Sequence, residues 1–190
     1  MESKESITKE MPLRRTAGRE KEYRTLRMYT WVFTLLASAA LVAVLFTAWL
    51  FGVQVRDVGM APAVMPGDVI LFDRLAKHVK APARGDILAY SSVTGSGTYI
   101  GRIVGLPGER VDVYDGRVYI GGVLLDERSY ASGALSGSIE AHTVPEGYYF
   151  ILPDDREHAL VDADKLTVEA SRIRGRAFIR VSPLSRLGIF

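Results

Sequence analysis

The longest run of hydrophobic residues lies near the start of the chain. Residues 31–51 (WVFTLLASAALVAVLFTAWLF) contain no charged side chain, and a helix of that length is about 31 Å long. This length matches the hydrocarbon core of a bilayer, and the run has no polar face, so the pattern predicts one transmembrane helix over 31–51. Tyr29, Trp31 and Trp49 lie near its ends, where aromatic residues favour the membrane interface.

The polar segments that flank this run predict its orientation. Residues 1–30 contain eight Lys and Arg, and those closest to the run are Arg14, Arg15, Arg19, Lys21, Arg24 and Arg27. The first twenty residues after the run contain only Arg56. Because cytoplasmic flanks are rich in Lys and Arg, we expect 1–30 to be a basic cytoplasmic tail and 52–190 to be an extracytoplasmic domain of a single-pass cell-membrane protein. The length of the tail argues against a cleaved signal peptide.

After residue 52 the pattern changes to short runs of β-branched and aromatic residues, separated by Gly, Pro and Asp. These runs predict a mainly β domain with strands over 69–72, 86–90, 98–104, 148–152 and 177–181. Within 110–127 (RVDVYDGRVYIGGVLLDE), the pairs Asp115–Gly116 and Gly121–Gly122 predict two consecutive hairpins. The segment 129–143, rich in Ser, Gly and Ala, predicts a flexible excursion.

Composition removes several classes of function. The chain has 190 residues and no Cys, which excludes a disulfide framework, a Cys-ligated metal site and a thiol nucleophile. Its net charge is +2, and residues 1–30 alone contribute +3. The remainder is therefore close to neutral, and we expect no nucleic acid partner. The three histidines show no ligand spacing, so we expect no metal and no cofactor.

Three arginines alternate along the chain near the C-terminus. In a strand, Arg172, Arg174 and Arg176 place their guanidinium groups on one face. Such a stripe contacts either anionic lipid headgroups or only solvent, and the near-neutral charge of the domain favours solvent.

Four sequence blocks follow the hydrophobic run in a fixed order. They are Met60-x-Pro62 with Gly67-Asp68, the block RIVGLPG over 102–108, the double hairpin with Gly116 and Gly122, and Asp154-x-Arg156. Together with the anchor they resemble the type I signal peptidase family, membrane serine proteases that remove signal peptides with a Ser nucleophile and a Lys general base. The resemblance covers most of 31–181 and implies a signal-peptidase-like β-sheet domain behind one transmembrane helix. It implies structural roles for Gly67, Asp68, Gly105, Pro107, Gly108, Asp154 and Arg156.

Both positions that carry the chemistry in that family are glycine here. The residue directly before Met60, where the family has its nucleophilic Ser, is Gly59. The residue directly before Arg102, where the family has its Lys, is Gly101. A Gly side chain can neither attack a carbonyl carbon nor accept a proton. The supporting Ser of the family corresponds to Ala159, so the resemblance implies a pseudoenzyme that has kept the scaffold and lost the catalytic dyad.

The leading hypothesis is therefore a non-catalytic accessory protein or chaperone for exported proteins. Signal-peptidase-like proteins without the dyad accompany pilus operons in Gram-positive bacteria, so the resemblance implies pilin-like clients, with the membrane lipid bilayer as a further partner. We expect a client to add as an extended strand to a groove. The groove candidates are Gly59, Met60, Pro62, Gly101 and Arg102, and the two glycines are expected to widen the groove.

Two other functions are compatible with the sequence. The first is an active signal peptidase I-type serine endopeptidase with an unrecognised nucleophile, which requires a relocated Ser–Lys pair. The candidates for such a pair are Ser91, Ser92 and Ser96 with Lys77 or Lys80, and exposed turn and surface residues are the simpler interpretation of all five. The second is a membrane-tethered β domain with a structural role in the cell envelope and no groove.

Overall fold

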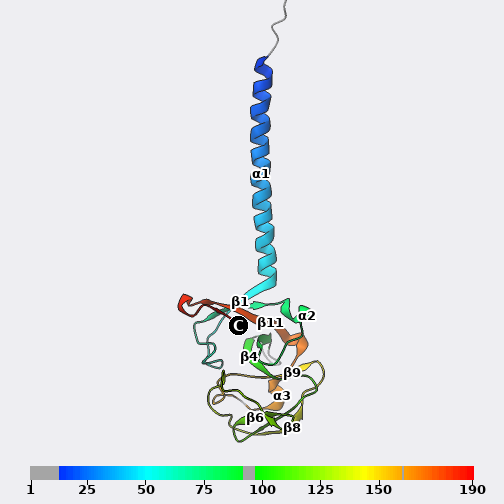
Figure 1. Ribbon diagram of the computed structural model, residues 1–190, viewed down its shortest axis with the longest axis vertical. Coiled ribbons are helices and arrows are strands. Elements are labelled where there is room, and N and C mark those ends of the chain that lie inside the picture. The colour runs from blue at the N-terminus through cyan, green and yellow to red at the C-terminus, as the bar shows by residue number, and fades with distance from the viewer. Residues whose placement is uncertain (1–12, 92–96, 160) are drawn as a thin grey trace, which may run out of the picture. The chain divides into compact units, whose positions relative to one another are not determined.

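The computed structural model describes residues 13–91, 97–159 and 161–190, and the chain divides into two units, residues 1–47 and 48–190 (Figure 1). The described part of the first unit, residues 13–47, belongs to the long helix α1, Leu13–Trp49. Its part from Tyr23 to Trp49 has 27 residues and a mean hydropathy of 2.2, which is long and apolar enough to cross a membrane. Hydroxyl groups in this stretch donate to the backbone three residues earlier, as Thr34 does to Trp31, so they need no external partner.

The bounds of α1 differ from the expected ones at both ends. The helix begins at Leu13, so most of the segment 1–30, which was expected as a basic tail, is helical. It ends at Trp49, and the next residue, Leu50, already belongs to strand β1 and is buried. Hydropathy could not separate the two elements, because the half-buried strand β1 needs apolar residues as much as the helix does. The apolar run 31–51 is thus a helix followed directly by a strand.

The larger of two sheets has eight strands, in the order β1-β2-β11-β3-β4-β9-β10, with β12 paired to β11. Every pairing in this sheet is antiparallel, and β11 carries register shifts that let the sheet curl. The strands are β1 (Leu50–Gln54), β2 (Val69–Asp73), β3 (Ile87–Ser91), β4 (Thr98–Gly105), β9 (Tyr148–Leu152), β10 (Thr167–Glu169), β11 (Ile173–Ser182) and β12 (Gly188–Ile189). All five strands predicted from the sequence are confirmed.

The smaller sheet has the order β7-β6-β5-β8, with β5 (Arg110–Tyr114), β6 (Arg117–Ile120), β7 (Val123–Leu124) and β8 (Ile139–Thr143). Figure 1 shows β6 and β8 at the end of the second unit opposite β1 and β11. Both predicted hairpins are confirmed, since Asp115, Gly116, Gly121 and Gly122 have φ of 50°, 69°, 59° and 82°.

The segment 129–143 differs from the expected flexible excursion. Its last five residues form β8, which pairs with β5, and Leu135 is buried in the core of the smaller sheet. Its first part is tied to the rest of the unit through Ser132, whose amide donates to the carbonyl of Asp154 at 2.9 Å. Small residues dominate the composition of this segment, but two apolar side chains, Leu135 and Ile139, are enough to fix it.

The second unit contains three groups of buried apolar side chains, and β9 contributes to two of them. Phe150 and Leu152 point into the core of the smaller sheet. Tyr149 and Ile151 alternate with them and point into a group that also contains Leu88. A third group lines the other face of β2 and β3. Short helices α2 (Ala76–Val79), α3 (Ala163–Leu166), η1 (Ala170–Arg172) and η2 (Leu184–Arg186) complete the unit.

Candidate functional site

The first site candidates lie in the loop that joins β1 to β2. The loop is closed by the amide of Val55, which donates to the carbonyl of Asp68 at 2.9 Å. Met60 is only 1% exposed and packs in the core, so its side chain does not line a surface groove, contrary to the expectation. Pro62 is exposed. At Gly59 the amide donates to Oδ1 of Asp57 at 3.0 Å, which makes a local turn at the position that carries the nucleophile in the resembled family.

The Gly67–Asp68 motif anchors this loop. Asp68 is 1% exposed, and its carboxylate accepts from the amide of Met65 at 3.0 Å. The same carboxylate pairs with Arg180 and Arg186, each at 3.2 Å. A buried carboxylate with three donors holds the loop in one conformation, so the structure supports a scaffold role for the motif.

Gly101 lies in β4 and is buried. A Cβ atom at this position would lie 2.5 Å from Cγ2 of Ile151 and 3.5 Å from Cε1 of Tyr90. The space that a side chain would need is therefore already filled by neighbours from β9 and β3. The expectation that Gly101 widens a groove is contradicted, because the glycine is what allows Ile151 to pack against β4.

The two glycine positions nevertheless come together at one end of β9. The carbonyl of Gly59 accepts from the amide of Asp155 at 3.0 Å. A Cβ at Gly59 would lie 3.8 Å from Cβ of Pro153, and one at Gly101 would lie 3.4 Å from the carbonyl of Leu152. Both positions thus border residues 152–155. The two motif positions therefore lie near the same segment, and neither residue has a side chain that can act as a nucleophile or a base.

Arg102 and Asp154 form a buried ion pair beside this point. Nε and Nη2 of Arg102 donate to the two carboxylate oxygens of Asp154 at 2.8 and 2.5 Å. Nη1 of Arg102 donates to the carbonyl of Gly85 at 2.8 Å. Asp154 is completely buried. These bonds use all three guanidinium nitrogens of Arg102 and join β4 to Gly85 and Asp154. The side chain is therefore not free to bind a client.

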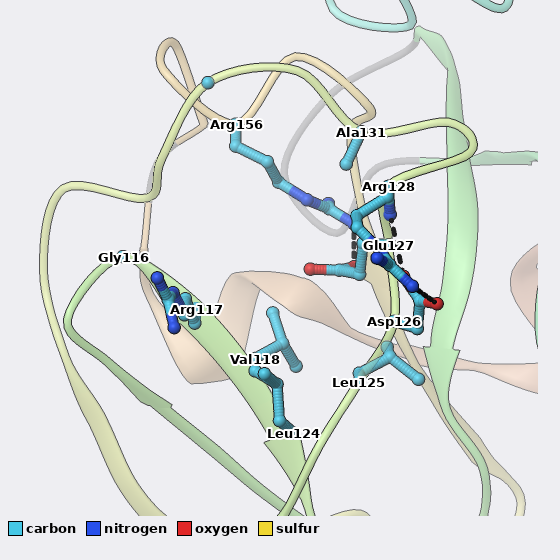
Figure 2. Close-up of a pocket in the computed structure, with 11 residues that line it drawn as sticks. Gly116, Arg117, Val118, Leu124, Leu125, Asp126, Glu127, Arg128, Ala131 and Arg156 are labelled. Carbon is cyan, nitrogen blue, oxygen red and sulfur yellow. Dashed lines mark hydrogen bonds and ion pairs between the residues drawn. The ribbon is translucent and has the colours of Figure 1, made fainter.

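Arg156 forms a second buried pair, with Glu127, as Figure 2 shows. Arg156 also donates to the carbonyl of Pro153. Tyr130 lies between the two arginines, with Cζ of Arg102 and Cζ of Arg156 at 4.4 and 6.0 Å from its ring centroid. Burial, reinforced by the charge of Glu127, raises the pKa of Tyr130 to about 12, so the phenol stays neutral and donates to Glu127 at 3.1 Å.

Sequence reasoning missed Glu127 and Tyr130. Both belong to or border a segment whose composition indicated flexibility, and their partners lie about 30 residues away in sequence, as the separation of 29 between Glu127 and Arg156 shows. The sequence contained one indication of this pair, because Arg156 belongs to a motif and a buried arginine needs an acidic partner. No local pattern identifies which acid supplies it.

An open cavity of about 520 Å³ lies on one side of Arg156 (Figure 2). Its walls come from the β6–β7 hairpin and from residues 125–133. The acidic side chains on its wall are already paired, Glu127 with Arg156 and Asp126 with Arg128. The hydrogen bonds from Arg128 lower the pKa of Asp126 to about 2. The two carboxylates on the wall are therefore neutralised by their arginine partners.

The remaining motif residues support the connection from β4 to the smaller sheet. Gly105 pairs with Phe150 of β9 and is buried. Gly108 donates its amide to the carbonyl of Val144 at 2.8 Å, next to Pro107. These contacts close the segment that leads from the larger sheet into the smaller one, in agreement with a scaffold role.

Part of the relocated Ser–Lys hypothesis falls outside the described residues, because Ser92 and Ser96 lie within 92–96. Ser91 ends β3 and is half-buried. Nζ of Lys77 donates to the carbonyl of Ile173 at 2.5 Å, whereas Lys80 is exposed. No Ser–Lys hydrogen bond joins these residues in the part of the chain that the structure describes.

The histidines lie apart from one another. His142 contacts Thr167 at 2.8 Å and His158 contacts Asp155 at 2.9 Å. Within residues 13–91, 97–159 and 161–190, no group of three His, Asp or Glu side chains is placed to hold a metal ion.

Comparison with known proteins gives a consistent family. The family model described as "Signal peptidase, peptidase S26" matches residues 28–182. A signal peptidase I of Leptolyngbya laminosa is 30% identical over 137 residues, which are 68% of this chain and 67% of the relative. A signal peptidase I of Bacillus licheniformis is 26% identical over 171 residues, which are 84% of this chain and 91% of the relative.

Two further matches are partial. The Synechocystis protein named "Probable signal peptidase I-2" is 29% identical over 136 residues, and the match spans 62% of that relative's length. The crystal structure of a signal peptidase I from Enterococcus faecalis is 31% identical, covers 51% of this chain and 97% of that chain, and superposes with a TM-score of 0.41.

Proposed function

The chain belongs to the signal peptidase family, peptidase S26, and from this premise we propose that it is a membrane-anchored member that binds exported polypeptides without cleaving them. The observation that carries the proposal is glycine at both dyad positions, with the side-chain space at Gly101 filled by Ile151. A site with no nucleophile, no base and no room for the base has lost the means of acyl transfer.

The anchor supports the membrane part of the proposal. The stretch Tyr23–Trp49 has the length and hydropathy of a membrane span. The basic residues that precede it favour a cytoplasmic N-terminus, with residues 50–190 outside the cytoplasm. Exported chains pass this side of the membrane, and the resemblance to dyad-less relatives makes pilin subunits the first clients to test.

The edge of the larger sheet supports the binding part. Among the described strands, β1 pairs only with β2. The amide of Arg74 donates to the carbonyl of Trp49, and the amide of Val55 donates to the carbonyl of Asp68. By the antiparallel alternation, the backbone groups of Gly52 and Gln54 point away from β2. They offer hydrogen bonds to an added strand, on an edge that leads directly into the loop with Gly59.

The first test is binding without cleavage. Purified full-length protein in detergent micelles is incubated with a synthetic signal peptide of about 25 residues or with a pilin precursor, followed by photo-crosslinking and mass spectrometry. We expect crosslinked but intact client. Specific cleavage that is lost with Ser91→Ala, Ser92→Ala or Ser96→Ala would overturn the proposal and identify a relocated nucleophile. Absence of both crosslinking and cleavage would favour a purely structural β domain.

Gln54→Pro tests the edge of β1. Proline removes the outward amide of residue 54 but leaves the bonds to β2, and edge strands tolerate proline at such positions. The loss of one backbone hydrogen bond to the client is expected to weaken binding about threefold to tenfold. Gln54→Ala is the matched control, because it removes the side chain and keeps the amide. Equal affinities of both variants for the synthetic signal peptide, measured by fluorescence anisotropy, would exclude β1 as the docking edge.

A further inference from the structure

Aromatic and basic side chains gather around the first residues of the second unit. Cζ of Arg74 lies 4.8 Å and Cζ of Arg174 lies 5.6 Å from the ring centroid of Phe51. Both arginines are exposed. The group consisting of Trp49, Phe51, Arg74, Leu75, Val79 and Arg174 is called the anchor-proximal patch below. It places two guanidinium groups around one aromatic ring.

The patch is held in a fixed geometry. Nε1 of Trp49 donates to Oδ1 of Asp73 at 2.7 Å, and the carbonyl of Trp49 accepts from the amide of Arg74 at 3.0 Å. The rings of Phe51 and Phe72 stack with centroids 5.6 Å apart. A Cβ at Gly175 would lie 2.8 Å from both the Phe51 ring and the carbonyl of Asp73, so glycine is needed for this approach.

The two arginines of the patch are exposed, and the carboxylate next to Arg74 in the chain is engaged by other donors. Oδ1 of Asp73, the residue before Arg74, already accepts from Trp49 and from the amides of Leu75 and Ala76 at 2.7 and 2.9 Å. Of the arginine stripe noted in the sequence, Arg176 pairs with Asp86 at 3.4 Å, whereas Arg174 reaches Phe51 and donates to the hydroxyl of Thr98 at 2.6 Å. The stripe is thus divided, and Arg174 belongs to the patch.

Exposed apolar side chains lie at the end of α1 and within the five residues that follow Arg74 in the chain. Trp49, Leu75 and Val79 are 40%, 52% and 86% exposed. Amphipathic aromatic rings and apolar side chains favour the interfacial region of a bilayer, and Arg attracts lipid phosphate there.

We propose that the anchor-proximal patch binds the phosphate headgroups of anionic phospholipids. The inference rests on the proposed membrane anchor, because Trp49 is the last residue of the apolar helix as well as a member of the patch. The patch therefore begins at the residue where the apolar helix ends, with no linker between them in the sequence. The ligand is therefore a lipid phosphate, and Arg74 and Arg174 are the residues that bind it.

Contact quenching of Trp49 tests the proposal. The chain has two tryptophans, so Trp31→Phe leaves Trp49 as the only reporter. The full-length variant is reconstituted in phosphatidylcholine vesicles that contain the same mole fraction of either brominated phosphatidylglycerol or brominated phosphatidylcholine. We expect the anionic lipid to associate next to Trp49 about tenfold more strongly than the zwitterionic lipid. At about 1 M salt, where the Debye length is near 3 Å, the preference is expected to shrink.

Matched variants separate charge from structure. In the Trp31→Phe background, Arg74→Gln with Arg174→Gln is expected to abolish the preference, whereas Arg74→Lys with Arg174→Lys keeps most of it. Arg117→Gln with Arg128→Gln removes the same charge from exposed positions on the smaller-sheet side and is expected to keep it fully. Equal quenching by both lipids, or a preference that survives the Gln variants, would overturn the proposal. This readout requires no client, so its failure leaves the client-binding test unaffected.

Discussion

Gly101→Lys is expected to lower the free energy of unfolding of the second unit by about 3 kcal/mol or more. The added Cβ would lie 2.5 Å from Cγ2 of Ile151, and the rest of the side chain has to enter a buried apolar group on the same face. Overpacking alone costs about 1–3 kcal/mol. Placing an ammonium group there without a partner adds a desolvation cost.

Urea unfolding of the full-length protein in detergent micelles, followed by circular dichroism of the β unit, measures this loss. Gly52→Lys is the matched control, because Gly52 is also in a strand but is exposed, and its Cβ would meet only Cδ2 of Leu71 at 3.5 Å. The control is expected to unfold close to the wild type. If Gly101→Lys were as stable as the control, Ile151 could not occupy the space described here.

The same contact predicts that restoring the dyad does not restore a protease. Gly59→Ser with Gly101→Lys is expected to show no cleavage of the synthetic signal peptide, because a displaced lysine has no fixed geometry relative to the serine.

Ile151→Ala should destabilise less in the Gly101→Lys background than alone, since it removes the clashing methyl group. Additive effects in this cycle would show that the two residues do not compete for one space.

Asp154→Asn is the second change with a large expected effect. It removes the charge that Arg102 faces through two hydrogen bonds, in a pair whose side chains are 0% and 12% exposed. Breaking a buried pair leaves an uncompensated charge, and the expected loss is about 3–5 kcal/mol of unfolding free energy. The loss is expected in the same urea experiment, as an earlier transition of the β unit.

Asp126→Asn provides the control for this prediction. Its pair with Arg128 has similar geometry, at 2.7 Å, but the side chains are 65% and 90% exposed. Water and salt already screen this pair, so little change in the transition is expected. Arg102→Met with Asp154→Leu removes both charges and should recover part of the loss. Equal effects of Asp154→Asn and Asp126→Asn would contradict a structural role for the buried pair.

Short sequence patterns correctly predicted the turns and strands whose conformation depends on neighbouring residues in the chain. The turn at Asp115–Gly116 follows from the positive φ that both residues adopt, and the strand at 69–72 follows from β-branched and aromatic residues. Local signals failed where an apolar residue has two possible environments. Leu50 extends the apolar run of the helix, but its burial next to β2 assigns it to a strand.

The candidate site shows the same division. The motifs located Gly59 and Gly101, and both border the end of β9. The sequence shows that the serine and lysine side chains are missing at these positions. Only the structure shows which neighbouring side chains fill the space. Ile151 lies 50 positions from Gly101 in the chain, so its role at the vacated position depends on the pairing of β4 with β9. The partners of Arg102 and Arg156 depend on equally distant contacts.

The position of the smaller sheet in the chain has a consequence for how this architecture can diverge. Strands β5 to β8 all lie between β4 and β9, which are neighbours in the larger sheet, and Gly105 pairs with Phe150 where the inserted segment leaves and returns. The ends of the insertion are therefore held together whatever its length, and added residues cost little closure entropy. The minimum length of the insertion is set by Phe150 and Leu152, because a shortened insertion would still have to shield both side chains from water.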